Sequence, residues 1–265
     1  MQLPCGQCIG CRMGKADEWA TRLWHEAQTH DRSAFITLTF NDEHLPADGS
    51  IRVRDVQLFI KRTRKRLGHN RVRFFACGEY GGDCSRPHYH VILYGFDFPD
   101  RYPWRKSESG HLCYRSPLLE ELWPYGYAEL GTVTRESLGY VARYVLKKVN
   151  GAAKAEHYRR VDPVTGEVHQ VAPEFITMST RPGIGAEWYT RFKGDAFPSD
   201  FVVVNGQKKP VPRYYKKKLD FGPALRVTAK RQVKAAKHAD NNTPDRLATR
   251  EEVQHRRVQR LKRTI

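Results

Sequence analysis

Two histidines that flank a single residue open an apolar run in the first half of the chain. His88 and His90 stand on either side of Tyr89, and Val91-Ile92-Leu93 follows them. In a β-strand, successive side chains point to opposite faces, so the two imidazoles share one face. Two imidazoles side by side can hold one metal ion. The spacing therefore predicts a metal site carried on a rigid strand.

A second strand pattern, residues 73–80, precedes the histidines and is separated from them by the turn residues Gly81-Gly82-Asp83. This loop predicts an antiparallel hairpin, in which cross-strand neighbours lie about 5 Å apart. Glu79 is then near His88 or His90. Two imidazoles and one carboxylate, with open positions left over, favour a catalytic over a structural metal centre. The alternative is a solvated carboxylate beside a chance pair of histidines.

Residues 135–149 have the clearest helical periodicity in the chain. One continuous apolar stripe consists of Leu138, Val141, Ala142, Val145, Leu146 and Val149. The other side carries four candidate catalytic residues: Tyr140, Tyr144, Lys147 and Lys148. A tyrosine oxygen can attack phosphorus as a covalent nucleophile, and lysines can neutralise phosphate charge. The alternative is a pair of half-exposed tyrosines that pack on a neighbouring segment.

Three of the six cysteines form a tight cluster near the N-terminus, Cys5-x-x-Cys8-x-x-Cys11. This spacing suggests a structural Zn²⁺ site, but zinc usually takes four ligands and no fourth is adjacent. Cys84 or a histidine would have to complete it. The alternatives are an ordinary N-terminal turn and a redox-sensitive cluster.

The composition favours a polyanionic partner. The chain of 265 residues has 46 basic and 29 acidic residues, a net charge of +17, and such an excess binds nucleic acid through counterion release. Residues 205–265 hold 18 basic and 5 acidic residues, so most of the excess lies there. An anionic membrane surface is the other candidate, although no apolar run reaches the length of a spanning helix and no signal peptide is visible.

The pattern of the remaining segments predicts an α+β fold with an antiparallel central sheet flanked by helices. Residues 96–125 are expected to be irregular, residues 162–169 to form a turn or small hairpin, and residues beyond about 222 to form basic helices. Further expected elements are helices over 15–30 and 53–67 and strands over 34–40, 126–133 and 175–180.

These motifs together resemble the replication initiators of the HUH endonuclease superfamily. Residues 35–40 look like the first motif, 87–93 like the HUH motif and 140–148 like the tyrosine motif in its two-tyrosine form. Residues 4–12 and 181–185 are similar to the gokushovirus branch of the Microviridae, the small single-stranded DNA bacteriophages. In that superfamily the middle residue of the HUH motif is often aliphatic, whereas here it is Tyr89.

The resemblance implies a ferredoxin- or RRM-like endonuclease domain over residues 16–204, between a cysteine-rich segment (1–15) and a basic helical extension (205–265). It implies that the protein nicks one strand of the phage origin in the host bacterial cytoplasm. Tyr140 or Tyr144 would take the 5′ phosphate, and His88, His90 and Glu79 would hold Mg²⁺ or Mn²⁺. Religation would then release circular single-stranded DNA. Its expected partners are single-stranded and origin DNA, a host helicase and a DNA polymerase.

Two other functions are compatible with parts of the pattern. A zinc-dependent hydrolase could use Glu79, His88 and His90 to activate water without any tyrosine. A non-enzymatic nucleic-acid-binding protein could use the cysteine cluster as a zinc element and leave the histidines without a role. The first motif, the HUH motif and the tyrosine motif, occurring in one order, favour the replication initiator.

Overall fold

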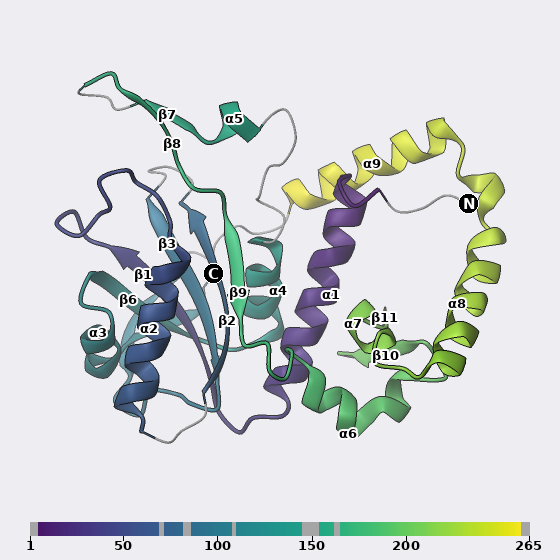
Figure 1. Ribbon diagram of the computed structural model, residues 1–265, viewed down its shortest axis with the longest axis horizontal. Helices are drawn as coiled ribbons and strands as arrows, with labels where there is room; N and C mark the ends of the chain where they lie inside the picture. The colour runs from purple at the N-terminus through teal and green to yellow at the C-terminus, as the bar shows by residue number, and fades with distance from the viewer. Residues whose placement is uncertain are drawn as a thin grey trace.

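The computed structural model describes residues 5–68, 72–81, 86–107, 110–144, 154–161 and 165–260. They form an α+β fold around a seven-stranded sheet whose strands all pair antiparallel, as predicted. The strands of this sheet are β1 Ser33–Phe40, β2 Arg73–Tyr80, β3 Pro87–Tyr94, β4 Tyr102–Lys106, β5 Leu112–Arg115, β6 Gly126–Thr132 and β9 Phe175–Met178. Their spatial order is β4-β5-β6-β1-β3-β2-β9, so the histidine strand β3 lies between β1 and β2 (Figure 1).

Helices cover both faces of this sheet, and two small hairpins extend from it. The hairpins are β7 Arg159–Val161 with β8 Val168–Gln170, and β10 Phe201–Val204 with β11 Gln207–Pro210. The α-helices are α1 Ile9–Ala27, α2 Val53–Arg66, α3 Pro117–Leu122, α4 Arg135–Tyr144, α5 Lys154–His157, α6 Ala186–Ala196, α7 Arg213–Lys216, α8 Phe221–Ala236 and α9 Pro244–Gln259. A 3₁₀ turn, Ala239–Asn241, separates the last two.

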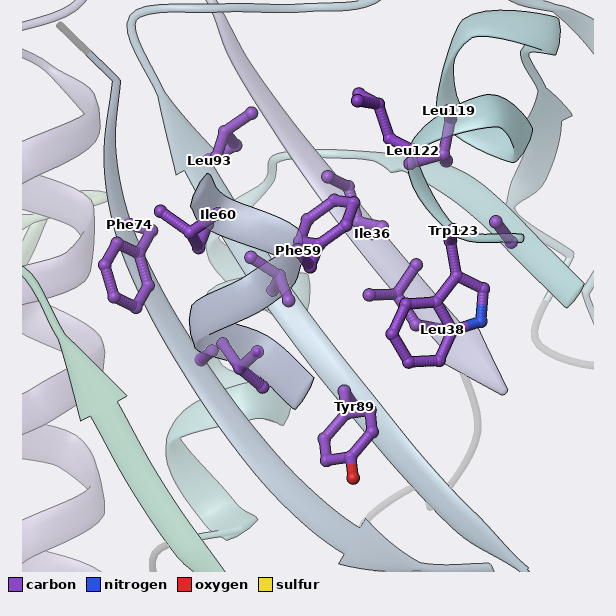
Figure 2. Packing of buried hydrophobic residues seen from close by; sticks show 14 of the residues in the cluster. Ile36, Leu38, Phe59, Ile60, Phe74, Tyr89, Leu93, Leu119, Leu122 and Trp123 are labelled. Carbon is purple, nitrogen blue, oxygen red and sulfur yellow. The ribbon is translucent and has the colours of Figure 1, made fainter. Parts of the chain in front are cut away.

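One face of the sheet is packed by α2 and α3. Helix α2 buries Val56, Phe59, Ile60 and Thr63, the spacing of one helical face. Figure 2 shows Phe59 and Trp123 packed over the strands that carry Ile36, Leu38 and Tyr89. Tyr89 is fully buried there, and its hydroxyl donates to Asp55 of α2 over 2.6 Å. The aromatic in the middle of the HUH motif therefore faces the core, which leaves its two histidines on the opposite face.

The opposite face of the sheet is covered by α1 and α4. Leu23 of α1 and Leu138, Val141 and Ala142 of α4 pack with apolar residues of β1, β2 and β3. The expected apolar side of the first helix and the first half of the expected stripe of the tyrosine helix are thus confirmed. The remaining stripe residues, Val145, Leu146 and Val149, lie outside the described residues.

Two expectations about local structure are wrong. The first helix begins at Ile9 and not near residue 15, so Cys11 is already helical. The stretch 96–125, expected to be irregular, contains β4, β5 and α3. Its prolines do not prevent structure: Pro117 occupies the first turn of α3, where no amide hydrogen is needed, and the hydroxyl of Ser116 accepts the Leu119 amide over 3.1 Å.

The C-terminal quarter packs onto α1 before it extends into basic helices. Helix α6, hairpin β10–β11 and α7 share a buried cluster that includes Tyr215 and Trp188. The expected domain boundary between residues 204 and 205 lies in the turn of this hairpin, between two paired strands. Helices α8 and α9 form the expected basic extension, and α9 returns to contact α1 (Figure 1). Among the residues described, none of the helices combines the length and apolar character needed to cross a membrane.

Candidate active site

The predicted metal ligands lie on the sheet face that α1 and α4 cover. In the register of the sheet, Glu79 of β2 is paired with His88 of β3, and Thr37 of β1 is paired with His90. Side chains at these paired positions point to the same face. The hairpin and its neighbour β1 thus bring a carboxylate, two imidazoles and a hydroxyl to one place.

Glu79 and His90 form a buried pair. The carboxylate Oε1 of Glu79 lies 3.0 Å from Nε2 of His90, and the two residues are 4% and 5% exposed. The other ring nitrogen of His90, Nδ1, lies 3.1 Å from the hydroxyl of Thr37. Both ring nitrogens are therefore engaged, and this fixes the orientation of the imidazole. The expectation that the hairpin places Glu79 beside one of the histidines is confirmed.

His88 is held differently. Its Nδ1 donates to the backbone carbonyl of Arg86 over 2.5 Å, so Nε2 carries the free electron pair of the neutral ring. Burial lowers the pKa of His88, which favours that neutral form. The ring lies against Gly81, where an added Cβ would meet Cε1 of His88 at 2.9 Å. A side chain at position 81 would displace this ring.

The two candidate tyrosines contact His90 directly. The ring of Tyr144 stacks on the imidazole with centroids 5.0 Å apart, and the ring of Tyr140 meets it edge-on at 5.4 Å. The Tyr144 hydroxyl donates to the Tyr140 hydroxyl. Both phenols thus lie at the metal-ligand pair, one helical turn apart.

The prediction that these tyrosines occupy the side of the helix away from the core is wrong. Tyr144 is only 7% exposed and belongs to the buried cluster, and Tyr140 packs against that cluster. The reason is that α4 contacts both α1 and β2, so its buried arc is wider than the apolar stripe alone. The buried side of α4 also includes the polar residue Ser137. The phenols fill the space between the helix and the polar end of the sheet face.

Burial also changes the acidity of the phenols. It raises the pKa of Tyr140 to about 12. The pKa of Tyr144 is raised further, first by burial and then by the negative charge of Glu79. Ionisation therefore costs less at Tyr140, which is the more exposed of the two. Lys147 and Lys148, the other two candidate catalytic residues, lie outside the described residues.

The donor atoms of Glu79 and His90 fit a divalent ion. Octahedral Mg²⁺ binds oxygen at about 2.1 Å, which puts adjacent ligand atoms about 3 Å apart. The 3.0 Å between Oε1 and Nε2 matches that edge. His88 is not gathered with them: within the described residues, the group of three possible ligands whose donor atoms all lie within 4.8 Å of one another is Cys5, Cys8 and Cys11. The bond to Arg86 keeps the His88 ring away from the pair.

The site lies within a stretch that matches a known family. Residues 33–149 match the family of the replication-associated protein ORF2, and this stretch carries every predicted metal ligand and both tyrosines. Replication-associated protein VP4 of Bdellovibrio phage phiMH2K is 36% identical over 220 residues. The chain belongs to this family of phage replication-associated proteins. The resemblance that the motifs predict is thereby confirmed.

Other phage replication-associated proteins are similar over most of the chain. ORF2 of Spiroplasma virus 4 is 29% identical over 230 residues, and ORF4 of Chlamydia phage 1 is 25% identical over 221 residues. The three matches cover 80%, 82% and 81% of this chain but only 65%, 68% and 52% of the relatives. The chain therefore spans between about half and two thirds of the length of these curated relatives. No solved structure matches it.

This replication-associated chain has a second group of metal-binding side chains, far from the histidines in sequence. Cys5, Cys8 and Cys11 stand at the beginning of α1, and their sulfurs are close enough to hold one metal ion. The backbone amides of Cys8 and Gln7 donate to the Cys5 sulfur and lower the pKa of its thiol to about 7. A substantial part of Cys5 is then thiolate at neutral pH, the form that binds metals.

Sequence reasoning missed one residue of the histidine site in the replication-associated chain. Thr37 belongs to the first motif, where the sequence alone assigns it no role, yet its hydroxyl orients His90. A signal was present: Thr37 and Thr39 alternate with apolar residues, so two hydroxyls share one face of a strand that is otherwise apolar or aromatic. What the pattern did not contain was the pairing of β1 with β3, which puts that face beside the histidines.

Proposed function

We propose that this chain is a replication initiator that nicks one strand of the phage origin through a metal-assisted attack by a tyrosine. The observation that carries the proposal is the contact of Tyr140 and Tyr144 with His90, whose Nε2 is paired with Glu79. A water-activating hydrolase needs no tyrosine at its metal ligands, whereas a covalent nuclease needs at least one. Membership of a family of replication-associated proteins supports the same choice.

The reaction is a phosphoryl transfer to a phenol. The oxygen of Tyr140 or Tyr144 attacks the scissile phosphorus, a new P–O(Tyr) bond forms and the bond to the 3′ oxygen breaks. The proton that leaves the phenol is balanced by the proton that the 3′ oxygen takes up. The products are a 5′-phosphotyrosine and a free 3′ hydroxyl that primes synthesis. Attack of a 3′ hydroxyl on the phosphotyrosine is the reverse step, and it closes a circle.

His90 and Glu79, together with His88, are the residues proposed to hold Mg²⁺ or Mn²⁺. The bound ion supplies charge that polarises the scissile phosphate. The protein supplies orientation: Thr37 fixes the His90 ring, and α4 fixes both phenols against it. Two phenols at one imidazole suit a cycle in which the second tyrosine cleaves the regenerated origin while the first still holds a DNA end. The lysines Lys147 and Lys148 are proposed to neutralise phosphate charge.

A groove between α7 and α8 supports single-stranded DNA as the substrate. It has a volume of about 690 Å³ and is lined by Arg213, Lys216, Lys217, Leu219, Phe221, Ala224, Leu225, Thr228 and Arg231. Phe221 is 85% exposed at its edge. Exposed aromatic rings stack on unpaired bases, and the surrounding cations bind phosphates. The groove therefore combines the two contacts that hold a single strand without reading its sequence.

Strand separation and synthesis are assigned to host proteins. The sequence has no Gly-x-x-x-x-Gly-Lys-Ser/Thr motif for binding ATP phosphates. We infer that a host helicase and a host DNA polymerase act on the nicked origin, in the cytoplasm of the infected bacterium. The alternative role of the basic helices, a solvated surface that mainly aids solubility, predicts no loss of DNA binding when the groove is changed.

The experiment that tests the proposal is capture of the covalent intermediate. The full chain is incubated with Mn²⁺ and overlapping single-stranded fragments of the phage genome, and a protein–DNA adduct is sought on a denaturing gel. The double variant Tyr140→Phe/Tyr144→Phe should form no adduct and cut no fragment. Tyr127→Phe is the matched control, because Tyr127 is an exposed tyrosine on the same sheet. Cleavage that survives in the double variant contradicts the tyrosine mechanism and favours a hydrolase.

A further inference from the structure

The cysteine cluster at the start of α1 has the dimensions of a site for a single metal ion. The sulfurs of Cys5 and Cys11 are 3.9 Å apart, and those of Cys5, Cys8 and Cys11 all lie within 4.8 Å of one another. Tetrahedral zinc binds thiolates at about 2.3 Å, which places any two of its sulfurs about 3.8 Å apart. An iron–sulfur cluster needs a wider spacing, because each of its cysteines binds a different iron atom. The spacing thus selects one shared ion.

The backbone around the cluster is arranged for a bound thiolate. The sulfur of Cys5 accepts the amide hydrogens of Gln7 over 3.4 Å and of Cys8 over 3.2 Å. Gly6 between them has a φ of +75°, a conformation that favours glycine, and this turns both amides toward the sulfur. Hydrogen bonds to a ligand sulfur stabilise its negative charge and fix its direction. These bonds exist before any ion is added.

The beginning of α1 also lacks the groups that normally stabilise a helix end. Cys8 is the N-cap residue and makes no side-chain cap hydrogen bond, and the first turn contains no acidic residue. The positive end of a helix favours negative charge placed at its first turn. Three thiolates that share a divalent cation carry a net negative charge there. The cluster therefore supplies the charge that this helix end is missing.

We infer that Cys5, Cys8 and Cys11 bind one Zn²⁺ ion through their thiolates, with a water molecule in the fourth position, and that this ion caps α1. Within the described ranges no fourth protein ligand joins the three sulfurs, and Cys5 is exposed to solvent. The ion has a structural task, since α1 and α4 together cover the sheet face with the catalytic residues. It lies outside the nuclease chemistry and does not depend on that proposal.

Metal analysis of the full chain tests this inference. The protein is purified under reducing conditions, supplied with Zn²⁺, freed of unbound metal and analysed for zinc and iron. We expect one zinc ion and no iron per chain. The Cys5→Ser/Cys11→Ser variant should lose the zinc. Cys113→Ser is the matched control, because Cys113 is a free thiol on β5, outside the cluster, and it should keep the zinc.

Two measurements on the unchanged protein keep the inference open to refutation if the serine variant does not fold. Replacement of zinc by Co²⁺ should give the charge-transfer absorption of a thiolate-bound cobalt ion. Removal of zinc with a chelator should speed hydrogen exchange of the amides in the first turns of α1, and added zinc should restore their protection. Iron in place of zinc, no zinc after reconstitution, a cobalt spectrum without thiolate bands, or exchange indifferent to zinc would each overturn it.

Discussion

The carboxylate of Glu79 contacts His90, although the strand register pairs Glu79 with His88. Its Oε1 reaches the Nε2 of His90, the diagonal neighbour, over 3.0 Å, while His88 is bonded to the backbone of Arg86. Diagonal contacts of this kind lie within reach of long side chains on one sheet face. Because both partners are buried, removal of either one leaves the other without its contact in a low-dielectric environment.

This contact makes Glu79→Gln the sharpest test of the metal site. Glutamine keeps the shape and a hydrogen bond to His90 but removes the charge that attracts a cation. We expect Mn²⁺ affinity and DNA cleavage to fall at least about 10- to 100-fold, the range known for groups that only support metal ligands. Titration calorimetry with Mn²⁺ and the cleavage assay measure the two effects.

The matched control is Glu129→Gln. Glu129 is paired with Thr37 on the far side of β1, and Arg105 holds its carboxylate with two contacts of 2.8 Å. It should bind Mn²⁺ as the unchanged protein does. Equal loss in both variants would mean that the general negative charge of the sheet face matters, and not the Glu79–His90 pair.

Thr37→Val tests whether orientation of His90 matters. Valine has nearly the shape of threonine but cannot bond to Nδ1 of His90, which lies 3.1 Å from the Thr37 hydroxyl. We expect Mn²⁺ affinity to drop about 10-fold or more, as for other groups that orient a metal-ligating histidine. Thr39→Val, two residues along the same strand face, should have a smaller effect. Metal binding unchanged in Thr37→Val would show that packing alone holds the ring.

Local signals were sufficient to predict the hairpin but not its surroundings. The turn after residue 80 and the alternation of residue types specify β2–β3, and with them the position of Glu79. Thr37 was missed because the contact between β1 and β3 joins residues that are 53 positions apart. The burial of Tyr140 and Tyr144 was missed because the width of the buried arc of α4 depends on α1 and the sheet together. Long-range packing decided what periodicity could not.

The order in which the tyrosines act can be predicted from their surroundings. Tyr140 is more exposed than Tyr144, and its pKa, raised to about 12 by burial, stays below that of Tyr144, which burial and the charge of Glu79 raise further. Tyr140 is therefore reached and ionised at lower cost. We expect Tyr140→Phe to lose most of the first covalent adduct in a single-turnover assay. Tyr144→Phe should keep that adduct and lose the later strand transfer. The opposite pattern would assign the first attack to Tyr144.

Stability should fall in acid because of one buried histidine. His25 of α1 stacks on Trp188 with ring centroids 3.5 Å apart, and its Nδ1 lies 2.9 Å from the Tyr215 hydroxyl. Burial lowers the pKa of His25 from 6.5 to about 3. The unfolded chain therefore binds more protons than the folded one between these values, so the contribution is complete above pH 6.5 and is lost as the pH falls.

The loss can be isolated with His25→Phe, which keeps an aromatic ring in the stack but cannot take up a proton. One proton corresponds to at most about 1.4 kcal/mol of unfolding free energy per pH unit. Urea unfolding at several values between pH 7 and pH 4 should give a shallower decline in the variant. The variant is expected to start lower at neutral pH, because Tyr215 loses its partner. Parallel declines would place the acid sensitivity in other groups.

Phe221 should contribute to binding of single strands and not of duplexes. Its ring is 85% exposed beside the cations Arg213, Lys216 and Lys217. Stacking of a base on such a ring is worth about 1–3 kcal/mol, so Phe221→Ala should weaken binding of a single-stranded oligonucleotide roughly 5- to 150-fold. The slope of affinity against salt should stay the same, because no charge is removed.

Lys216→Ala and Leu247→Ala complete this test. Removal of the Lys216 charge should weaken binding and also reduce the salt slope by about one unit. Leu247 is an exposed apolar residue of α9 outside the groove, and its change should have no effect. Fluorescence anisotropy at several salt concentrations separates the stacking effect from the charge effect. If Phe221→Ala and Leu247→Ala bind single strands alike, the exposed ring has no part in DNA binding, and the groove acts through its charge alone.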